Sequence, residues 1–235
     1  EELRSLFLPC LSSAIDDLTL ELEHGVQMLC KTRTEKGDAG RKKRKLIVNE
    51  GPPYPGCMRV LGQVLLLLER SLRADGRAGG DWIRTEEGKR FHTILDPVAK
   101  LFHCNLQFDG ADGENLPTYK GFVEGTTEKD DGNVIGCLTA LALAAGDEQL
   151  WKPLNHAVLE AAGRDGRSEV RRAGLVCLLA VMKSLGEEYM VLLPECLPTL
   201  SELLEDTNEE VAGLARDIIT LAEDLLGESL EESLR

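Results

Sequence analysis

Histidine and cysteine side chains, which carry much of the metal and nucleophile chemistry of proteins, are thinly spread in this sequence. The four histidines have no paired nucleophile nearby and lie at His24, His92, His103 and His156. His92, His103 and Cys104 come closest to a ligand set, but their spacing does not put two ligands on adjacent helical turns. No second ligand pair follows at zinc-site spacing. The sequence therefore predicts no metal and no cofactor.

Two further segments have the composition of ligand-binding loops without the required spacing. Asp109, Asp112 and Glu114 resemble a calcium loop but lack its pattern of ligand positions and its distal glutamate. The glycine cluster after Asp75 lacks the Lys-Ser/Thr of a phosphate-binding loop, so we expect a flexible turn. Serine-hydrolase and zinc-protease motifs are also absent. We expect a protein that is not an enzyme and has no small-molecule substrate.

Basic residues gather at two places in a chain whose formal net charge is −14. That charge argues against nucleic-acid binding by the whole surface, which would require phosphate neutralisation. The two basic sets are the run Arg41, Lys42, Lys43, Arg44, Lys45 and the cluster Arg164, Arg167, Arg171, Arg172. Both are candidate RNA contacts. The run could equally be a nuclear or nucleolar address, or simply a solvated loop.

The end of the chain is acidic. From Glu202 onward many carboxylates accompany only two bases, Arg216 and Arg235. Such a segment should repel RNA and could meet a basic protein partner. A solvated helix face is the commoner reason for a pattern of this kind.

The helices that must position these residues form a repeat between Leu150 and Leu230. A shift of 41 positions takes Pro153 to Pro194. The same shift relates Val170 to Val211, Leu178 to Ile219 and Gly186 to Gly227. A register without gaps at this spacing is typical of HEAT or armadillo units, which are about 40–47 residues of paired helices. The alternative is a chance match of two amphipathic hairpins.

The residue types also predict how the repeats pack. Apolar residues from Val211 to Leu226 fall on one helical face, whereas Val170–Leu185 is apolar almost all round and should have neighbours on both sides. Thr207, three before Glu210, predicts a capping box, and Gly227 predicts a left-handed C-terminal cap. The residues expected to pack the repeats together are Leu150, Trp151, Pro153, Leu154, Val170, Val211, Ile218 and Leu226.

The rest of the chain also has the pattern of helices. Apolar stripes predict helices over Leu3–Cys30, Cys57–Leu72, Trp82–Phe102 and Val134–Ala145, with a kink or break at Asp96-Pro97. Glycine, proline and charge predict loops at about 32–56, 74–81 and 107–132. We therefore expect an all-α fold, an α-solenoid of HEAT-like helical hairpins with a long basic loop and glycine-rich insertions.

We expect two regions in this solenoid. Residues 1–145 would hold irregular HEAT-like hairpins, and 146–235 two C-terminal HEAT repeats, at about 147–186 and 187–227, with an acidic tail. No apolar run reaches membrane length, so we expect no membrane partner. Seven scattered cysteines without a CxxC pair favour a reducing compartment. The start at Glu1 fits a fragment of a longer chain, although processing or trimming would look the same.

Several strings in the second half of the sequence resemble one known family. Asp-Glu-Gln-Leu-Trp-Lys-Pro-Leu-Asn-His, from Asp147 to His156, is similar to a signature near the C-terminus of the U3 small nucleolar RNA-associated protein ten family, very large HEAT-repeat proteins of the small-subunit processome. The family's last repeats are also resembled by Arg171–Ala173, Leu185–Tyr189, Leu192–Glu195, Leu203–Asp206 and Glu209–Val211. The resemblance runs from about Leu65 to Gly227 and is strongest from Val134 on.

The resemblance implies a non-catalytic scaffold in the nucleolus of the nucleus that supports pre-ribosomal RNA transcription and processing toward 18S rRNA. It implies partners among other small-subunit processome proteins. It also implies contact, direct or indirect, with the pre-rRNA 5′ external transcribed spacer or U3 small nucleolar RNA. Two alternatives stay open, a HEAT-repeat adaptor for transport or a phosphatase, and a solenoid that mainly binds RNA directly.

Overall fold

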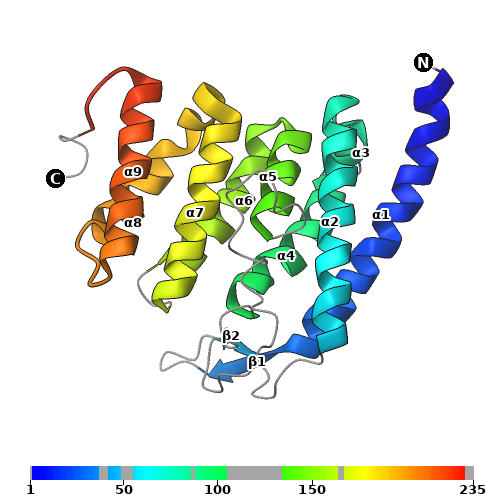
Figure 1. Cartoon of the computed structure of the whole chain (residues 1–235), viewed down its shortest axis with the longest axis horizontal. Coiled ribbons are helices and arrows are strands. Elements are labelled where there is room, and N and C mark those ends of the chain that lie inside the picture. The colour runs from blue at the N-terminus through cyan, green and yellow to red at the C-terminus, as the bar shows by residue number, and fades with distance from the viewer. Residues whose placement is uncertain are drawn as a thin grey trace.

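The computed structural model describes residues 2–36, 42–48, 55–85, 88–104, 134–163 and 167–230 (Figure 1). Side chains are described for 13–27, 61–85, 88–102, 134–163 and 167–230. The predicted loop at 107–132 and the tail after Leu230 lie outside the described residues, as do Arg41 and Arg164.

Helices make up most of the described chain, and the longer ones stand in pairs. The helices are α1 (Glu2–Leu29), α2 (Pro55–Arg77), α3 (Asp81–Arg84), α4 (Lys89–Cys104), α5 (Val134–Ala145), α6 (Glu148–Ala162), α7 (Ser168–Leu185), the 3-10 helix η4 (Gly186–Leu192), α8 (Leu193–Leu203) and α9 (Glu209–Leu226). Helix α1 packs on α2, α4 on α5, α6 on α7, and α8 on α9.

The pairs stack into two rows that run the length of the molecule. In one row α2 contacts α5, α5 contacts α7, and α7 contacts α9. In the other row α1 contacts α4, α4 contacts α6, and α6 contacts α8. Figure 1 shows the first row side by side, with the two ends of the chain at opposite ends of the stack. This arrangement confirms the predicted all-α solenoid.

Helix α7 lies in the middle of this packing. It contacts α5, α6 and α9, and its buried side chains cover most of its circumference, from Val170 to Met182. The prediction that Val170–Leu185 has neighbours on both sides is therefore confirmed. Helix α9, at the end of the row, keeps an exposed polar face that includes Arg216, Asp217 and Thr220.

The caps of α9 follow the predicted chemistry at one end only. Asn208 begins the helix, and its Oδ1 accepts from the N–H groups of Glu210 at 2.9 Å and Val211 at 3.3 Å. The predicted capping box at Thr207 is therefore wrong by one residue, because Asn208 takes the donors that the threonine would need. Gly227 ends the helix with φ 72° and ψ 17°, which confirms the left-handed cap.

The segment 32–56 was predicted to be an irregular basic loop, but it contains most of a β-hairpin. Strand β1 (Cys30–Lys36) pairs antiparallel with β2 (Lys42–Val48), from Cys30 opposite Val48 to Lys36 opposite Lys42. The prediction failed because glycine, proline and charged residues dominate this segment, and only Leu46–Val48 has the composition of a strand. The hairpin is attached to the helices, since β1 contacts α1 and β2 contacts α4.

Two other boundaries differ from the predicted ones. The loop expected at 74–81 is shorter, because α2 continues to Arg77 and α3 begins at Asp81. The break in the next helix falls before Lys89, and Pro97 stays inside α4. The helix pairs α6–α7 and η4/α8–α9 occupy Glu148–Leu185 and Gly186–Leu226. The division of the chain into two regions at residue 146 stays a prediction.

Candidate functional site

Arg171 and Asp206 form a shielded ion pair between the last two repeats. Arg171 lies on α7 and Asp206 in the turn before α9, and the guanidinium meets both carboxylate oxygens, Nε to Oδ2 at 2.8 Å and Nη2 to Oδ1 at 2.9 Å. The side chains are only 11% and 3% exposed. Asp206 also accepts the N–H of Asn208 at 2.9 Å. Because paired geometry and low exposure strengthen such a contact, it fixes the start of α9 against α7.

This ion pair changes the interpretation of the second basic cluster. Arg171 is mostly buried and paired with Asp206, which leaves little of its side chain open to RNA, and its predicted RNA contact stays untested. The Nε of Arg172 lies 3.3 Å from the Oε2 of Glu210, and both of these side chains are exposed. Arg167 is exposed at the start of α7, and Arg164 lies outside the described residues. RNA contact by Arg164, Arg167 or Arg172 stays a prediction.

The basic run lies on the hairpin. Lys42, Lys43, Arg44 and Lys45 belong to β2, opposite Lys36, Glu35, Thr34 and Arg33 of β1, respectively. The register thus puts a base opposite a base at Lys36/Lys42 and at Arg33/Lys45. Binding of RNA by this run stays a prediction.

Most of the residues expected to pack the repeats together are inaccessible. Trp151, Leu154, Val170, Val211 and Ile218 are buried, whereas Leu150 and Pro153 are partly buried. The Nε1 of Trp151 donates to the carbonyl oxygen of Ala142 at 2.8 Å, which ties the start of α6 to α5. Leu226 is the exception. It is 37% exposed at the last turn of α9, so the expectation of core packing is wrong at that position.

A polar cluster inside the last two repeats was missed by sequence reasoning. The hydroxyl of Tyr189 donates to Oδ1 of Asn155 at 2.5 Å and lies 3.2 Å from Sγ of Cys196. These side chains come from α6, η4 and α8, and all three are buried. Burial raises the pKa values of Tyr189 and Cys196 above their usual ranges, so both stay protonated and neutral. Asn155 between the apolar positions Trp151 and Val158 was the sequence signal for this cluster.

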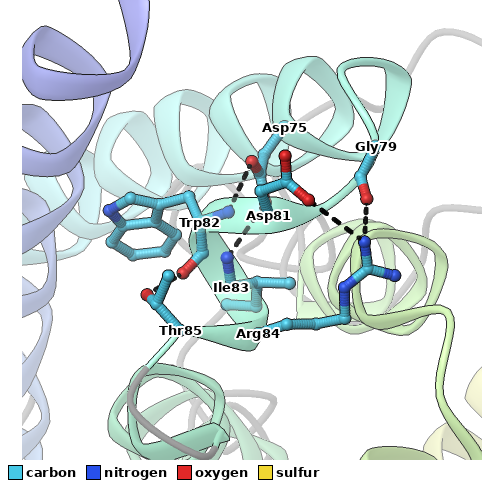
Figure 2. A network of polar contacts seen from close by, with 7 residues as sticks. All are labelled: Asp75, Gly79, Asp81, Trp82, Ile83, Arg84 and Thr85. Carbon is cyan, nitrogen blue, oxygen red and sulfur yellow. Dashed lines mark hydrogen bonds and ion pairs between the residues drawn. The ribbon is translucent and has the colours of Figure 1, made fainter.

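The turn between α2 and α3 is built around a buried carboxylate (Figure 2). Asp75 accepts from the N–H groups of Trp82 at 3.2 Å and Ile83 at 3.1 Å, which are the unpaired donors at the start of α3. Arg84 reaches back to the carbonyl oxygen of Gly79 and to Asp81. Gly80 has φ 70°, and a Cβ there would collide with the carbonyl oxygen of Ala144. The predicted flexible turn is therefore a specific structure held by Asp75.

The stability of the chain should depend on pH through Asp75. Burial raises the pKa of this carboxyl above its usual value of 3.8, against the opposing effect of the two N–H donors. The folded chain thus binds the proton more tightly than the unfolded chain. The stabilisation is complete below pH 3.8 and is lost as the pH rises through the folded pKa, about 1.4 kcal/mol for each tenfold difference in proton affinity.

Urea unfolding of the parent and of Asp75→Asn measures this effect. The pH should run from about 4 to about 7, because the raised pKa places the titration of Asp75 above pH 3.8. The stability of the parent relative to the variant should fall as the pH rises. Asp81→Asn, which changes an exposed carboxylate of the same turn, is the matched control and should show no comparable trend. A difference that is constant or grows with pH would contradict the prediction.

Potential metal ligands do not converge among the described side chains. No three histidine, cysteine, aspartate or glutamate side chains in these segments could hold a metal ion together. His24, His92 and His156 are exposed on α1, α4 and α6. The cysteines Cys137 and Cys177 are buried among aliphatic side chains, and burial raises their thiol pKa values above the usual range. They act as small apolar side chains that fill the core.

Comparison with known proteins gives relatives with a HEAT-repeat name. The chain is 39% identical over 118 residues to human HEAT repeat-containing protein 1, an alignment that covers 50% of this chain and 6% of that protein. It is 40% identical over 103 residues to U3 small nucleolar RNA-associated protein 10 of Chaetomium globosum, covering 44% of this chain and 6% of that protein. The chain is therefore homologous to these two proteins over about half of its own length. The resemblance seen in its sequence strings is thereby confirmed.

An uncharacterized protein of Arabidopsis thaliana aligns with the whole chain at 29% identity over 239 residues, which is 10% of its own length. No family model matches the chain. The chain thus spans about a tenth or less of each of these three relatives. Its paired helices are consistent with the HEAT repeats for which the human relative is named. In the segments that the structure describes, no helix combines the length and the apolar character that crossing a membrane requires.

Proposed function

We propose that the chain is a non-catalytic scaffold segment of a nucleolar ribosome-biogenesis factor, acting through protein–protein contacts in the small-subunit processome. In this role it supports pre-rRNA transcription and processing toward 18S rRNA. The observation that carries the proposal is the homology to a protein named for its association with U3 small nucleolar RNA. The two-row stack suits the role, because solenoids present long surfaces to extended partners.

The side chains described above also support a scaffold over an enzyme. The buried tyrosine and cysteine of the Asn155 cluster are neutral, and the Arg171–Asp206 pair joins two repeats. These polar groups hold helices together. The proposal therefore assigns the function to the outer surface of the stack.

Affinity purification of the tagged chain from cells tests this function. We expect other small-subunit processome proteins to co-purify, enriched over an unrelated HEAT-repeat solenoid of similar length that carries the same tag. A preparation that contains transport or phosphatase components in their place would overturn the proposal in favour of an adaptor in another pathway.

A second arm of the same experiment separates protein contact from RNA contact. The observation that favours RNA is the basic run on β2, in a chain that is otherwise acidic. RNase treatment before elution should leave the processome proteins in place if protein contacts hold them. Their complete loss after RNase would show that pre-rRNA or U3 small nucleolar RNA bridges them, and would overturn the protein-contact mechanism.

A further inference from the structure

Trp82 is a buried tryptophan whose ring nitrogen has no hydrogen-bond acceptor in the segments that the structure describes. The residue is only 4% exposed. Trp151, the second tryptophan of the sequence, is also buried, but its Nε1 donates to Ala142 at 2.8 Å. A buried donor without a partner destabilises the fold, so an unpaired one needs an explanation such as a missing ligand.

The Trp82 side chain lines a pocket of about 170 Å³ where α1, α3 and α4 meet. Figure 2 shows its indole ring pointing away from the Asp75 carboxylate, toward α1. Lys89 and Arg90, at the start of α4, lie on the same pocket, and the Arg90 guanidinium is 4.7 Å from the centre of the indole ring. The pocket therefore combines an unused N–H donor with two cations.

The remaining side chains of this pocket decide what kind of anion it suits. Asp16 and Thr19 of α1 and Thr93 of α4 complete its wall. The two threonine hydroxyls already donate to backbone carbonyl oxygens, of Ile15 and Lys89. Asp16 adds one negative charge to a lining with two cations, so the lining suits a small anion with a single charge over a strong polyanion.

A second hollow, of about 440 Å³, continues this pocket between α1 and α4. The two share Lys89 and Thr93, and the second extends past His92 and Asp96 to Lys100. On the α1 side it is lined by Glu23, Val26 and Gln27. We call the two hollows together the α1–α4 groove. Its lining mixes basic, acidic and apolar groups.

We propose that the α1–α4 groove binds an acidic peptide segment of a partner protein, with one aspartate or glutamate carboxylate in the pocket at Trp82. The carboxylate accepts the Nε1–H of Trp82 and pairs with Lys89, while Arg90 stays stacked on the indole. The flanking residues lie along the second hollow. The inference rests on the proposed function, since it supplies one contact surface for a scaffold that works through proteins.

A nucleic-acid strand is a poorer occupant of the same groove. Its phosphates would follow one another at every nucleotide, and Asp16, Glu23 and Asp96 interrupt the cations along the groove. A peptide places its negative charge only where Lys89 and Arg90 lie and elsewhere offers N–H groups to the carboxylates. The groove therefore matches a segment with an isolated acidic residue.

The two tryptophans make this proposal measurable by NMR on the intact chain. In a ¹⁵N-labelled sample each indole gives one N–H signal, assigned from whichever of Trp82→Phe and Trp151→Phe yields a folded spectrum. The probe is an acetylated and amidated pentapeptide with a central glutamate. Matched peptides carry glutamine or lysine at the centre, and a uridine octanucleotide represents RNA.

We expect the glutamate peptide to move the Trp82 indole proton downfield and to leave the Trp151 signal in place. Binding of the glutamine peptide should be about tenfold weaker, as expected for loss of one charge-assisted hydrogen bond. Lys89→Gln should weaken binding of the glutamate peptide by a similar factor. The matched control, Lys183→Gln on the exposed end of α7, should not change it.

The proposal is overturned if no peptide moves the Trp82 signal, if the lysine peptide moves it equally, or if Lys89→Gln binds like the parent. It is also overturned if the uridine octanucleotide moves the signal and the glutamate peptide does not. Loss of processome proteins from the affinity purification would leave this titration unchanged. A failed titration would not alter the set of co-purifying proteins, so the two proposals can fail separately.

Discussion

Replacing Ile218 by aspartate should destabilise the last repeat by about 4 kcal/mol or more, because the change buries a carboxylate without a partner. Ile218 is 0% exposed and lies on the face of α9 that packs into the core. Helix α9 contacts α7, α8 and η4, so the new charge would be enclosed by apolar side chains. In a thermal melt followed by circular dichroism, the midpoint of the C-terminal transition should fall by roughly 10 °C.

Thr220→Asp is the matched control, because it adds the same carboxylate to the exposed face of α9. We expect that change to stay within about 0.5 kcal/mol of the parent. A melting curve of Ile218→Asp that coincides with that of Thr220→Asp would contradict the packing of α9 shown by the structure.

Replacing Arg171 by methionine should cost about 3 kcal/mol, the second large effect. Methionine keeps the length of the side chain but leaves the Asp206 carboxylate, which is 3% exposed, without the guanidinium that neutralises it. We therefore expect the loss in the free energy of unfolding to come mainly from the buried charge of Asp206 and only slightly from lost packing contacts. Urea unfolding of the variant measures it through the shift of the transition midpoint.

Two further variants identify the cause of this loss. Arg172→Met removes the neighbouring arginine, whose partner Glu210 is 75% exposed, and should cost less than about 1 kcal/mol. Adding Asp206→Asn to Arg171→Met should recover part of the stability, because the amide is neutral and its oxygen still accepts from Asn208. Equal effects of the two arginines, or no recovery in the double variant, would show that the ion pair does not join the repeats.

Much of this architecture could be predicted because a helix that packs in a row must show its burial in its own sequence. The almost uniformly apolar Val170–Leu185 indicates a helix covered on several sides, and α7 does contact α5, α6 and α9. The 41-residue shift predicts that α7 and α9 are neighbours, and they are. Gly227 predicts the end of α9, because the residue after the helix has a positive φ that glycine adopts most easily.

The errors occur where one residue outcompetes another for the same role. Thr207 and Asn208 can both cap a helix, and the preference depends on the turn that Asp206 fixes with its other contacts. The hairpin could not be foreseen from its basic strands, since their pairing depends on backbone hydrogen bonds and not on alternating apolar residues.

The candidate site was harder to predict than the fold, because each of its contacts joins residues that are distant in sequence. Arg171 looks like a surface base until Asp206 is brought opposite it. Asp75 looks like part of a flexible glycine turn until α3 places two N–H donors over it. The groove at Trp82 likewise needs α1 and α4 to be set side by side. Composition alone carries no information about these contacts between residues distant in sequence.

The two rows of helices have a mechanical consequence. Each pair is joined mainly to the pairs beside it, so a small rotation at every joint adds up to a large change in the curvature of the whole stack. A solenoid of this kind can bend without losing the contacts between any two neighbouring pairs. The Arg171–Asp206 ion pair makes the contact between the last two pairs more rigid, so a partner that pulls on both ends would bend the molecule at the other contacts.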